Sequence, residues 1–401
     1  MRKIIFSCLM IIASVPIINA QNTDKILQEI LSNNLEIKAE SMNVKSSGYE
    51  LKANNNLPDP EIEIGYNFGN KKGEKDKYDL AISQSFDWPG IYGARNSANK
   101  LKMNAFSYLF DQKKMELLLK AKMLCIDLIN INQQIKMQND IVKNYENLFL
   151  NYQKGFKQGE INILDINKLK IELLGTRSKL VSYQNQQKIL KEDLNQLNGG
   201  KPFDDNSIDA LTNYDEGKLL PLADYENQVK EIDPENKYYA TLAEASKKDI
   251  AVNKLGWFPS FTLGYKYSYE QGDKFNGFIA ATSIPLFSNR YKTKMAEAKQ
   301  IENVFLQDNA MSGKYAKLKG KYNKLITLGS NIEAYKGILN DGNNLGVLRK
   351  ALDGGQISLL NYLIEYKYFL DAQAELISMQ YEYNQLLSEI NKYNLLQKQI
   401  N

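Results

Sequence analysis

The chain of 401 residues contains no histidine and only two cysteines. Histidine is the commonest general base near neutral pH and the commonest metal ligand, so Ser-His catalysis, Cys-His catalysis and Cys/His metal sites are excluded. The sequence also lacks a glycine-rich phosphate loop and a convincing pair of carboxylates for acid–base chemistry. We therefore expect no catalytic, cofactor-binding or metal-binding site and no enzyme.

Long apolar runs are confined to the N-terminus. Two basic residues precede an apolar stretch over 4–18, and the small residue Ala20 follows it, which is typical of a secretory signal peptide. We predict that residues 1–20 form this signal, which leaves Cys125 as the one remaining cysteine and excludes an intrachain disulfide. A secreted chain without another run of ~18 apolar residues can span a membrane only as a closed β-barrel. The net charge is only +4, so no nucleic-acid partner is expected.

What the sequence does contain is an internal repeat with a spacing of about 200 residues. One copy reads Leu-Pro-Asp-Pro-Glu-Ile-Glu-Ile-Gly-Tyr over 57–66, and the other reads Phe-Pro-Ser-Phe-Thr-Leu-Gly-Tyr over 258–265. Each copy predicts a helix, two strands, a long helix, a glycine turn and a return helix. We predict a first repeat over 21–199, an irregular Asp/Asn-rich linker over 200–232, and a second repeat over 233–401.

Alternation of apolar and polar residues predicts the strands. In the first strand the apolar set is Ile62, Ile64, Tyr66 and Phe68, and the polar set is Glu61, Glu63, Gly65 and Asn67. The four predicted strands cover 61–68, 78–86, 261–269 and 277–286, with hairpin loops over 69–77 and 271–276.

Uninterrupted helical patterns dominate the rest of the chain. The predicted helices cover 24–56, 91–155, 166–197, 233–256, 290–352 and 357–397. At ~1.5 Å per residue, the helix over 91–155 would be roughly 96 Å long. Apolar residues recur along it in alternating steps of three and four, the spacing of a coiled-coil seam. The expected fold class is mainly α with a small β part: duplicated long helical hairpins plus four strands per chain.

Four strands are too few to close a barrel, because the smallest closed barrels use about eight and fill their interior with side chains. Three chains would supply twelve strands around a water-filled lumen, continued by a tube of twelve helices. Aromatic residues on the strands suit the interfacial girdle of such a barrel. The alternative from pattern alone is a four-stranded sheet with one face buried in a soluble protein.

The duplicated arrangement resembles the TolC-type outer-membrane efflux proteins. Four segments carry the resemblance: 57–61, 83–90 (Ser-Gln-Ser-Phe-Asp-Trp-Pro-Gly), 155–165 and 283–287 (Ser-Ile-Pro-Leu-Phe). The resemblance implies an outer-membrane homotrimer, in contact with outer-membrane lipid and with a long periplasmic extension. It also implies two partners, a periplasmic adaptor (membrane fusion protein) and an inner-membrane pump of the RND type.

By this resemblance the adaptor contacts the turns at the tips of the helical hairpins. The expected contact residues are Gly155, Gly159, Glu160, Ile161, Asp165, Gly355, Gln356, Ile357 and Asn361. The residues themselves agree in part, because glycine permits a reversed backbone and the two isoleucines would be apolar side chains at exposed turns. The alternative is that the glycines only make turns and the isoleucines begin a coiled-coil stripe.

The remaining expectations concern the strands and the overall role. Glu61 and Glu63 would form three-fold acidic rings in the lumen, and such rings favour cations, although exposed glutamates also serve solubility alone. Lys72 and Asp273 are expected in external loops. We expect a passive exit duct for small molecules or metal ions in a tripartite efflux pump. The alternative is a secreted, soluble coiled-coil scaffold or adhesin without a pore.

Overall fold

The computed structural model describes residues 17–70, 73, 75–215, 217–340 and 344–397. The predicted signal peptide lies outside the described residues as far as residue 16, and so does Lys72. The chain folds into two compact units, each built from both repeats. The helical unit draws on Met1–Ile37, Lys114–Glu226 and Ala316–Asn401, and the sheet unit draws on Lys38–Lys113 and Asn227–Tyr315.

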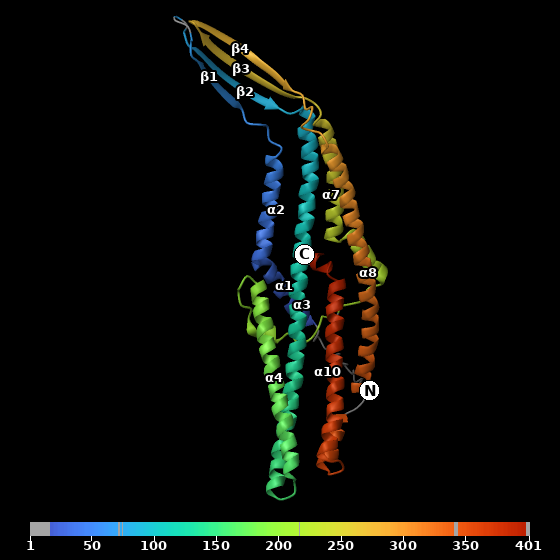
Figure 1. Ribbon diagram of the computed structural model, residues 1–401. Helices are drawn as coiled ribbons and strands as arrows, with labels where there is room; N and C mark the ends of the chain where they lie inside the picture. Colours follow the sequence, from blue (N-terminus) through green and yellow to red (C-terminus); the bar gives the residue numbers. More distant parts are fainter. Residues whose placement is uncertain (1–16, 71–72, 74, 216, 341–343, 398–401) are drawn as a thin grey trace, which may run out of the picture. The chain divides into compact units, whose positions relative to one another are not determined.

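The sheet unit contains one antiparallel sheet with the strand order β1-β2-β3-β4 (Figure 1). The strands are β1 (Glu61–Asn67), β2 (Lys77–Phe86), β3 (Ser260–Glu270) and β4 (Asp273–Ser283). The central pair, β2 and β3, joins the two repeats, with Tyr78 opposite Tyr269 at one end and Phe86 opposite Phe261 at the other. The predicted strands are thus confirmed as elements, with changes in the last one.

The hairpin between β3 and β4 is tighter than expected. Gln271 and Gly272 have φ angles of 53° and 107°, so two residues reverse the chain and Glu270 pairs directly with Asp273. The predicted loop over 271–276 is therefore wrong, and Asp273 is the first residue of β4 rather than a loop residue. The strand also ends at Ser283 instead of residue 286, because Pro285 cannot donate a ladder hydrogen bond.

Helices of the sheet unit are tied together by polar contacts. They are α2 (Leu35–Ala53), α7 (Pro234–Leu255) and the first parts of α3 (Pro89–Lys157) and α8 (Lys292–Asn340). Asn99 of α3 donates to the Leu51 carbonyl of α2 at 2.7 Å, and Lys102 of α3 pairs with Asp249 of α7 at 2.9 Å. The long helix predicted over 91–155 is confirmed by α3, which has 69 residues.

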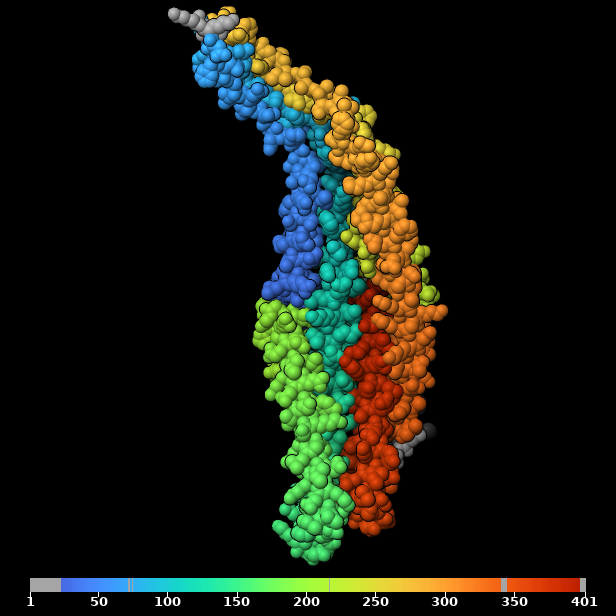
Figure 2. Space-filling view, in the orientation of Figure 1, coloured from blue at the N-terminus to red at the C-terminus, as the bar shows by residue number. Residues whose placement is uncertain are grey.

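The helical unit packs two hairpins around a shared core. Its other helices are α1 (Ile17–Asn33), α4 (Ile163–Leu197), α5 (Asp205–Asp209), α6 (Leu222–Glu231), α9 (Asn344–Asp353), α10 (Leu359–Ile390) and α11 (Asn394–Gln397). Buried side chains from α3, α4, α9 and α10 form one cluster that includes Ile141, Leu148, Leu169, Leu352 and Tyr362. A second cluster joins Leu328 and Ile332 of α8 to Met379 of α10, and these two helices lie side by side in Figure 2. The predicted coiled-coil seams are therefore the buried stripes.

Two predicted helices are interrupted, and part of a third lies outside the described residues. The helix expected over 24–56 breaks at Asn34, whose Oδ1 accepts from the Ile37 backbone N–H at 2.9 Å and caps α2. The helix expected over 290–352 is described as α8 and α9, and residues 341–343 lie outside the described part of the chain. The helix expected over 357–397 ends at Ile390, before the short α11.

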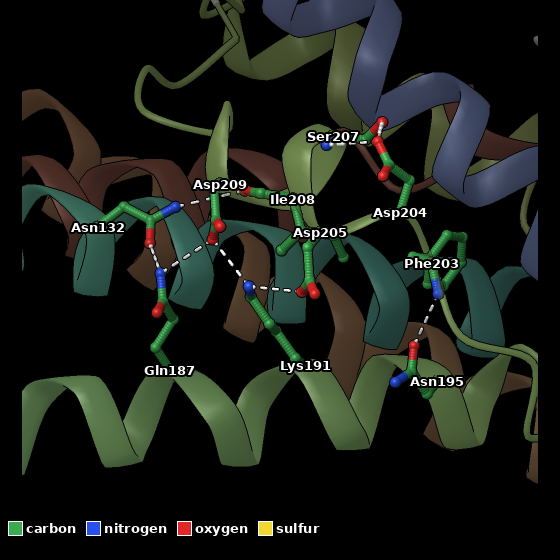
Figure 3. A network of polar contacts seen from close by, with 10 residues as sticks. All are labelled: Asn132, Gln187, Lys191, Asn195, Phe203, Asp204, Asp205, Ser207, Ile208 and Asp209. Carbon is green, nitrogen blue, oxygen red and sulfur yellow. Dashed lines mark hydrogen bonds and ion pairs between the residues drawn. The ribbon is translucent and has the colours of Figure 1, made fainter.

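The linker predicted over 200–232 is irregular in part, but it also contains two short helices, α5 and α6, which the prediction did not include. Figure 3 shows how α5 is held: Lys191 of α4 lies 2.8 Å from both Asp205 and Asp209. Gln187 of α4 donates to Asp209 at 3.2 Å and to Asn132 of α3 at 2.6 Å. These long-range polar contacts, together with the buried Ile208 and Leu211, fasten the linker to both helices.

Equivalent positions of the two repeats make equivalent caps. Asn34 caps α2, and Asp233 caps α7 by accepting from the Asn236 backbone N–H at 2.9 Å. Asn34 also donates to the Leu197 carbonyl at 2.8 Å, while the fully buried Asp233 lies 2.5 Å from Lys314. The internal repeat therefore extends to the polar contacts at the start of each copy. Across the described residues, no helix is both long and apolar enough to cross a membrane.

Candidate channel faces and helical tips

The sheet has one apolar and one polar face, because alternate residues of each strand point to opposite sides. Cross-strand pairs such as Ile62 opposite Ile82 and Ile64 opposite Leu80 place the apolar residues of neighbouring strands on the same side. The apolar face comprises Ile62, Ile64, Tyr66, Tyr78, Leu80, Ile82, Phe86, Phe261, Leu263, Tyr265, Tyr267, Tyr269 and Phe278. Much of it is bare: Ile64 is 79% exposed and Phe278 is 92% exposed.

The polar face carries mainly small and charged side chains, although β4 departs from this pattern: its Phe275 and Ile279 lie on the polar face, and its Lys274 and Asn276 lie on the apolar face. Two ion pairs cross between strands on it: Lys266 with Asp79 at 3.3 Å, and Lys77 with Glu270 at 3.1 Å. Glu61 and Glu63 lie on this face, as predicted, opposite Ser83 and Ala81. Neither of the two glutamates has an ion-pair partner among the described residues, so both leave their charge uncompensated.

Both hairpin tips end their first helix with the same Schellman motif. At the first tip, Glu160 N–H donates to the Gly155 carbonyl at 2.9 Å and Gly159 N–H donates to the Phe156 carbonyl at 3.0 Å. At the second tip, Gln356 N–H and Gly355 N–H donate in the same pattern to residues 351 and 352, at 2.8 and 3.0 Å. The φ angles of Gly159 and Gly355 are 80° and 69°. The prediction that these two glycines reverse the chain is confirmed.

Each return helix is capped by the side chain that stands three residues after the glycine, and the sequence analysis missed both caps. Asn162 accepts from the Leu164 backbone N–H at 2.9 Å, and Ser358 accepts from the Asn361 backbone N–H at 3.2 Å. The signal was present, since Asn and Ser are favoured N-caps and both stand at the same offset from the glycine. The two tips therefore share a Gly-x-Ile-cap sequence and one backbone geometry.

The structure separates the predicted tip residues into exposed and packed ones. Glu160, Gln356 and Asn361 are exposed, whereas Ile161 and Ile357 are half-buried and Asp165 pairs with Lys168 at 3.2 Å. Ile357 packs against the core cluster of the helical unit, so the two isoleucines contribute to packing more than to the surface.

Gly155 does not reverse the chain, because it lies inside the last turn of α3 and only its carbonyl takes part in the Schellman motif. A Cβ atom there would come within 2.6 Å of Cγ1 of Ile161, so this position needs glycine for close packing rather than for a special φ angle. Other apolar side chains are exposed beside the tips: Ile163 and Leu164 at the first, and Leu360 at the second. The sequence analysis did not single them out.

A polar and aromatic contact joins the two hairpins behind the tips. Asn144 of α3 donates to the Tyr362 hydroxyl of α10 at 3.1 Å. The Tyr362 ring stacks on Tyr366 at 5.7 Å, and Tyr145 of α3 meets Tyr366 edge-on at 5.9 Å. Burial raises the pKa of Tyr366 to about 12, so its hydroxyl stays neutral at physiological pH.

Cys125 is a buried free thiol in the helical unit. Burial raises the pKa of this thiol to about 12, so almost no reactive thiolate forms near neutral pH. The described residues contain no cluster of three or more acidic, cysteine or histidine side chains that could hold a metal ion.

Sequence comparison and structure comparison both find outer-membrane proteins similar to this chain. Residues 26–200 match the family described as "Outer membrane efflux protein". The chain is 20% identical to the probable outer membrane lipoprotein SilC of Salmonella typhimurium over 93% of this chain and 85% of SilC. Its fold superposes on the outer membrane protein VceC of Vibrio cholerae with a TM-score of 0.75 at 14% identity, over 94% of this chain and 96% of VceC. It also superposes on CusC, described in connection with transmembrane channel formation, with a TM-score of 0.75 at 16% identity, over 94% and 92% of the two chains.

The fold is therefore that of outer-membrane channel proteins, mainly helical with a small antiparallel sheet. Residues 26–200 are thus similar to the outer-membrane efflux proteins, and the chain shares the fold of such channels. The resemblance and the fold class predicted from the sequence are confirmed. The matched family and SilC are both described as outer-membrane proteins, in agreement with the predicted location. The family matched by residues 26–200 and the solved structures with this fold are efflux or channel proteins rather than enzymes, and they favour the duct over the soluble scaffold.

Proposed function

We propose that this protein is the outer-membrane channel of a tripartite efflux pump, a passive duct through which small molecules or metal ions leave the cell. The observation that carries the proposal is the two-faced sheet, whose apolar side is bare and whose polar side carries the charges. An apolar face of this size would promote aggregation in water, whereas a membrane-spanning barrel needs such a face as its lipid-facing outer surface. The polar face then lines the path of the cargo.

The sheet also supports a homotrimer. Strands β1 and β4 form its two edges, and each edge leaves a row of backbone groups without partners in the sheet. In a membrane these groups must be paired, and pairing β1 of one copy with β4 of the next satisfies both edges. Three copies make a twelve-stranded barrel, and their helical hairpins make the periplasmic tube.

The hairpin tips are the proposed contact surface for a periplasmic adaptor and, through it, an inner-membrane pump of the RND type. The support is the repetition of one rigid turn in both repeats, with exposed polar residues at Glu160 and Gln356. Exposed Ile163, Leu164 and Leu360 add apolar area beside each turn. A partner that binds both tips would meet similar geometry twice in each protomer.

Fractionation combined with surface labelling tests this function. We expect the protein in the outer membrane as a detergent-stable trimer, with the β3–β4 hairpin outside the cell. An Asp273→Cys variant should then react with an impermeant maleimide on intact cells, while the buried Cys125 stays silent in the unsubstituted protein. A matched Glu160→Cys variant, with its cysteine at a tip, should react only after the outer membrane is permeabilised. Recovery in the soluble fraction, or protection of residue 273 on intact cells, would contradict the proposal.

The acidic residues of β1 should make the pore prefer cations. In planar bilayers under a KCl gradient, we expect the double variant Glu61→Gln/Glu63→Gln to lower the cation-over-anion permeability ratio several-fold, because it removes six negative charges from a trimeric lumen. Glu226→Gln on α6, an exposed glutamate outside the sheet, should leave the ratio unchanged. An unchanged ratio in the double variant would show that these glutamates do not face the conducting path.

A further inference from the structure

The end of the sheet where strands give way to helices is rich in aromatic residues. Both tryptophans of the chain, Trp88 and Trp257, lie there. The Trp88 ring stacks on Phe258 with centroids 4.8 Å apart and an interplanar angle of 23°, and it lies 6.0 Å from Phe261. Phe261 belongs to the apolar face of the sheet, so this aromatic cluster continues the surface that the proposed function places against lipid.

A groove of about 230 Å³ opens beside this cluster. We call it the junction groove; its lining includes Trp88, Arg95, Asn253, Phe258, Asn289 and Lys292. Asn289 is only 4% exposed and donates to the Asn253 carbonyl at 2.6 Å, while Asn253 donates to the Lys292 carbonyl at 3.2 Å. These two side-chain amide contacts join the start of α8 to the end of α7 along the groove.

The rim of the groove carries unbalanced positive charge. Arg290, Lys292 and Lys294 lie along this segment, and none of them forms an ion pair within the described part of the chain. Inside the groove, Arg95 pairs with Asp87 at 2.8 Å. The two helices that begin at this junction, α3 and α8, have no acidic residue in their first turns, so the positive ends of their dipoles add to the positive potential there.

The loop before α8 presents this charge together with apolar side chains. Tyr291 has a φ angle of 66°, a strained conformation for a residue with a Cβ atom. The Arg290 guanidinium lies over the Tyr291 ring, 4.9 Å from its centroid, in a cation–π contact. Leu286 and Phe287 precede it and are exposed, Phe287 by 79%. Aromatic rings, apolar side chains and cations without ion-pair partners among the described residues thus occur together on one short segment. This combination suits the boundary between lipid tails and headgroups.

We propose that the junction groove binds the headgroup of an anionic phospholipid in the leaflet of the outer membrane that faces the periplasm. The lipid phosphate lies between Arg290 and Lys292 at the rim, and its acyl chains lie along Trp88 and Phe258 toward the apolar face of the sheet. The inference rests on the proposed function, because it takes that face to be the lipid-facing one. It adds a lipid class and a binding site, and the bound lipid fixes the depth at which the sheet sits in the membrane.

The two tryptophans report on the groove directly. The full-length protein, purified in a non-ionic detergent, is titrated with dioctanoyl phosphatidylglycerol, with dioctanoyl phosphatidylcholine and with inorganic phosphate while tryptophan fluorescence is recorded. We expect a saturable change with phosphatidylglycerol that persists in Trp257→Phe, where Trp88 is the reporter. Phosphatidylcholine should bind at least tenfold more weakly, and inorganic phosphate should not displace the anionic lipid.

A charge-matched pair of variants tests the residues. Arg290→Ala/Lys292→Ala should weaken phosphatidylglycerol binding about 25-fold, or roughly fivefold for each charge removed near an anionic surface. Lys317→Ala/Lys319→Ala removes the same charge from positions further along α8 and should leave binding unchanged.

Three results would overturn the proposal: equal binding of the two lipids, complete displacement by phosphate, or equal weakening in both double variants. If the rim variants do not form trimers, the comparison of the two lipids on the unsubstituted protein decides alone. Outer-membrane trimers that show no preference for the anionic lipid would refute the lipid site and leave the channel function intact.

Discussion

Replacing Ile64 with arginine should remove the protein from the outer membrane, whereas replacing its neighbour Glu63 with arginine should not. Ile64 is 79% exposed on the apolar face, opposite Leu80, and Glu63 lies on the polar face, opposite Ala81. An arginine on the lipid side of a membrane barrel costs about 2–4 kcal/mol near the bilayer midplane. A trimer carries three such substitutions, so the total penalty approaches the whole stability of a typical domain.

The measurement is the yield of detergent-stable trimer from outer-membrane fractions. We expect Ile64→Arg to reduce it at least tenfold and Glu63→Arg to leave it within about twofold of the unsubstituted protein. Both variants introduce the same side chain one residue apart on β1, so strand propensity and expression are matched. Normal trimers of Ile64→Arg, or equal loss in both variants, would mean that the apolar face does not meet lipid.

Local patterns in the sequence were sufficient to predict the strands and the turns at the tips. Alternation alone assigned Ile64 and Glu63 to opposite faces, and the pairing of β1 with β2 agrees. Gly159 and Gly355 were identified as turn residues because glycine adopts positive φ without strain, and both do so. These features depend on backbone preferences within a few residues.

Features that depend on contacts distant in sequence were missed. Helix α5 is held by ion pairs of Lys191 with Asp205 and Asp209. No local sequence pattern links the lysine to these two aspartates, so the sequence did not predict the contact. Gly155 was assigned to the turn although its role is close contact with Ile161. The β3–β4 turn was missed because Gln271, at a positive φ of 53°, is not a typical turn residue.

The sheet needs neighbouring copies of the chain to be complete, whereas the tips do not. Four strands per chain leave two unpaired edges and so call for neighbouring copies, whereas each tip is complete within one chain through its own caps and Schellman bonds. A change at a tip should therefore disturb contact with partners and spare assembly of the trimer. A change on the sheet should do the reverse.

Gly159→Val and Gly355→Val should each impair export strongly while leaving trimers intact, and the double variant should abolish export. An L-residue in the left-handed region costs roughly 1–2 kcal/mol, and a β-branched side chain is especially disfavoured there. No neighbouring atom lies within 4 Å of a Cβ placed at either glycine, so backbone strain rather than a clash is the cause. The tip must then leave the Schellman geometry, which misplaces Glu160 or Gln356.

Two control variants separate strain from bulk at these tips. Gly175→Val makes the same chemical change inside α4, where φ is not positive and a Cβ also meets open space, and should leave export normal. Gly159→Asn should retain most export, because asparagine tolerates the left-handed conformation far better than valine does. The measurements are the accumulation of ethidium in cells that lack the unsubstituted protein, and the yield of trimer. Normal export in the double valine variant would remove the tips from the mechanism, and loss of trimers would show that assembly depends on them after all.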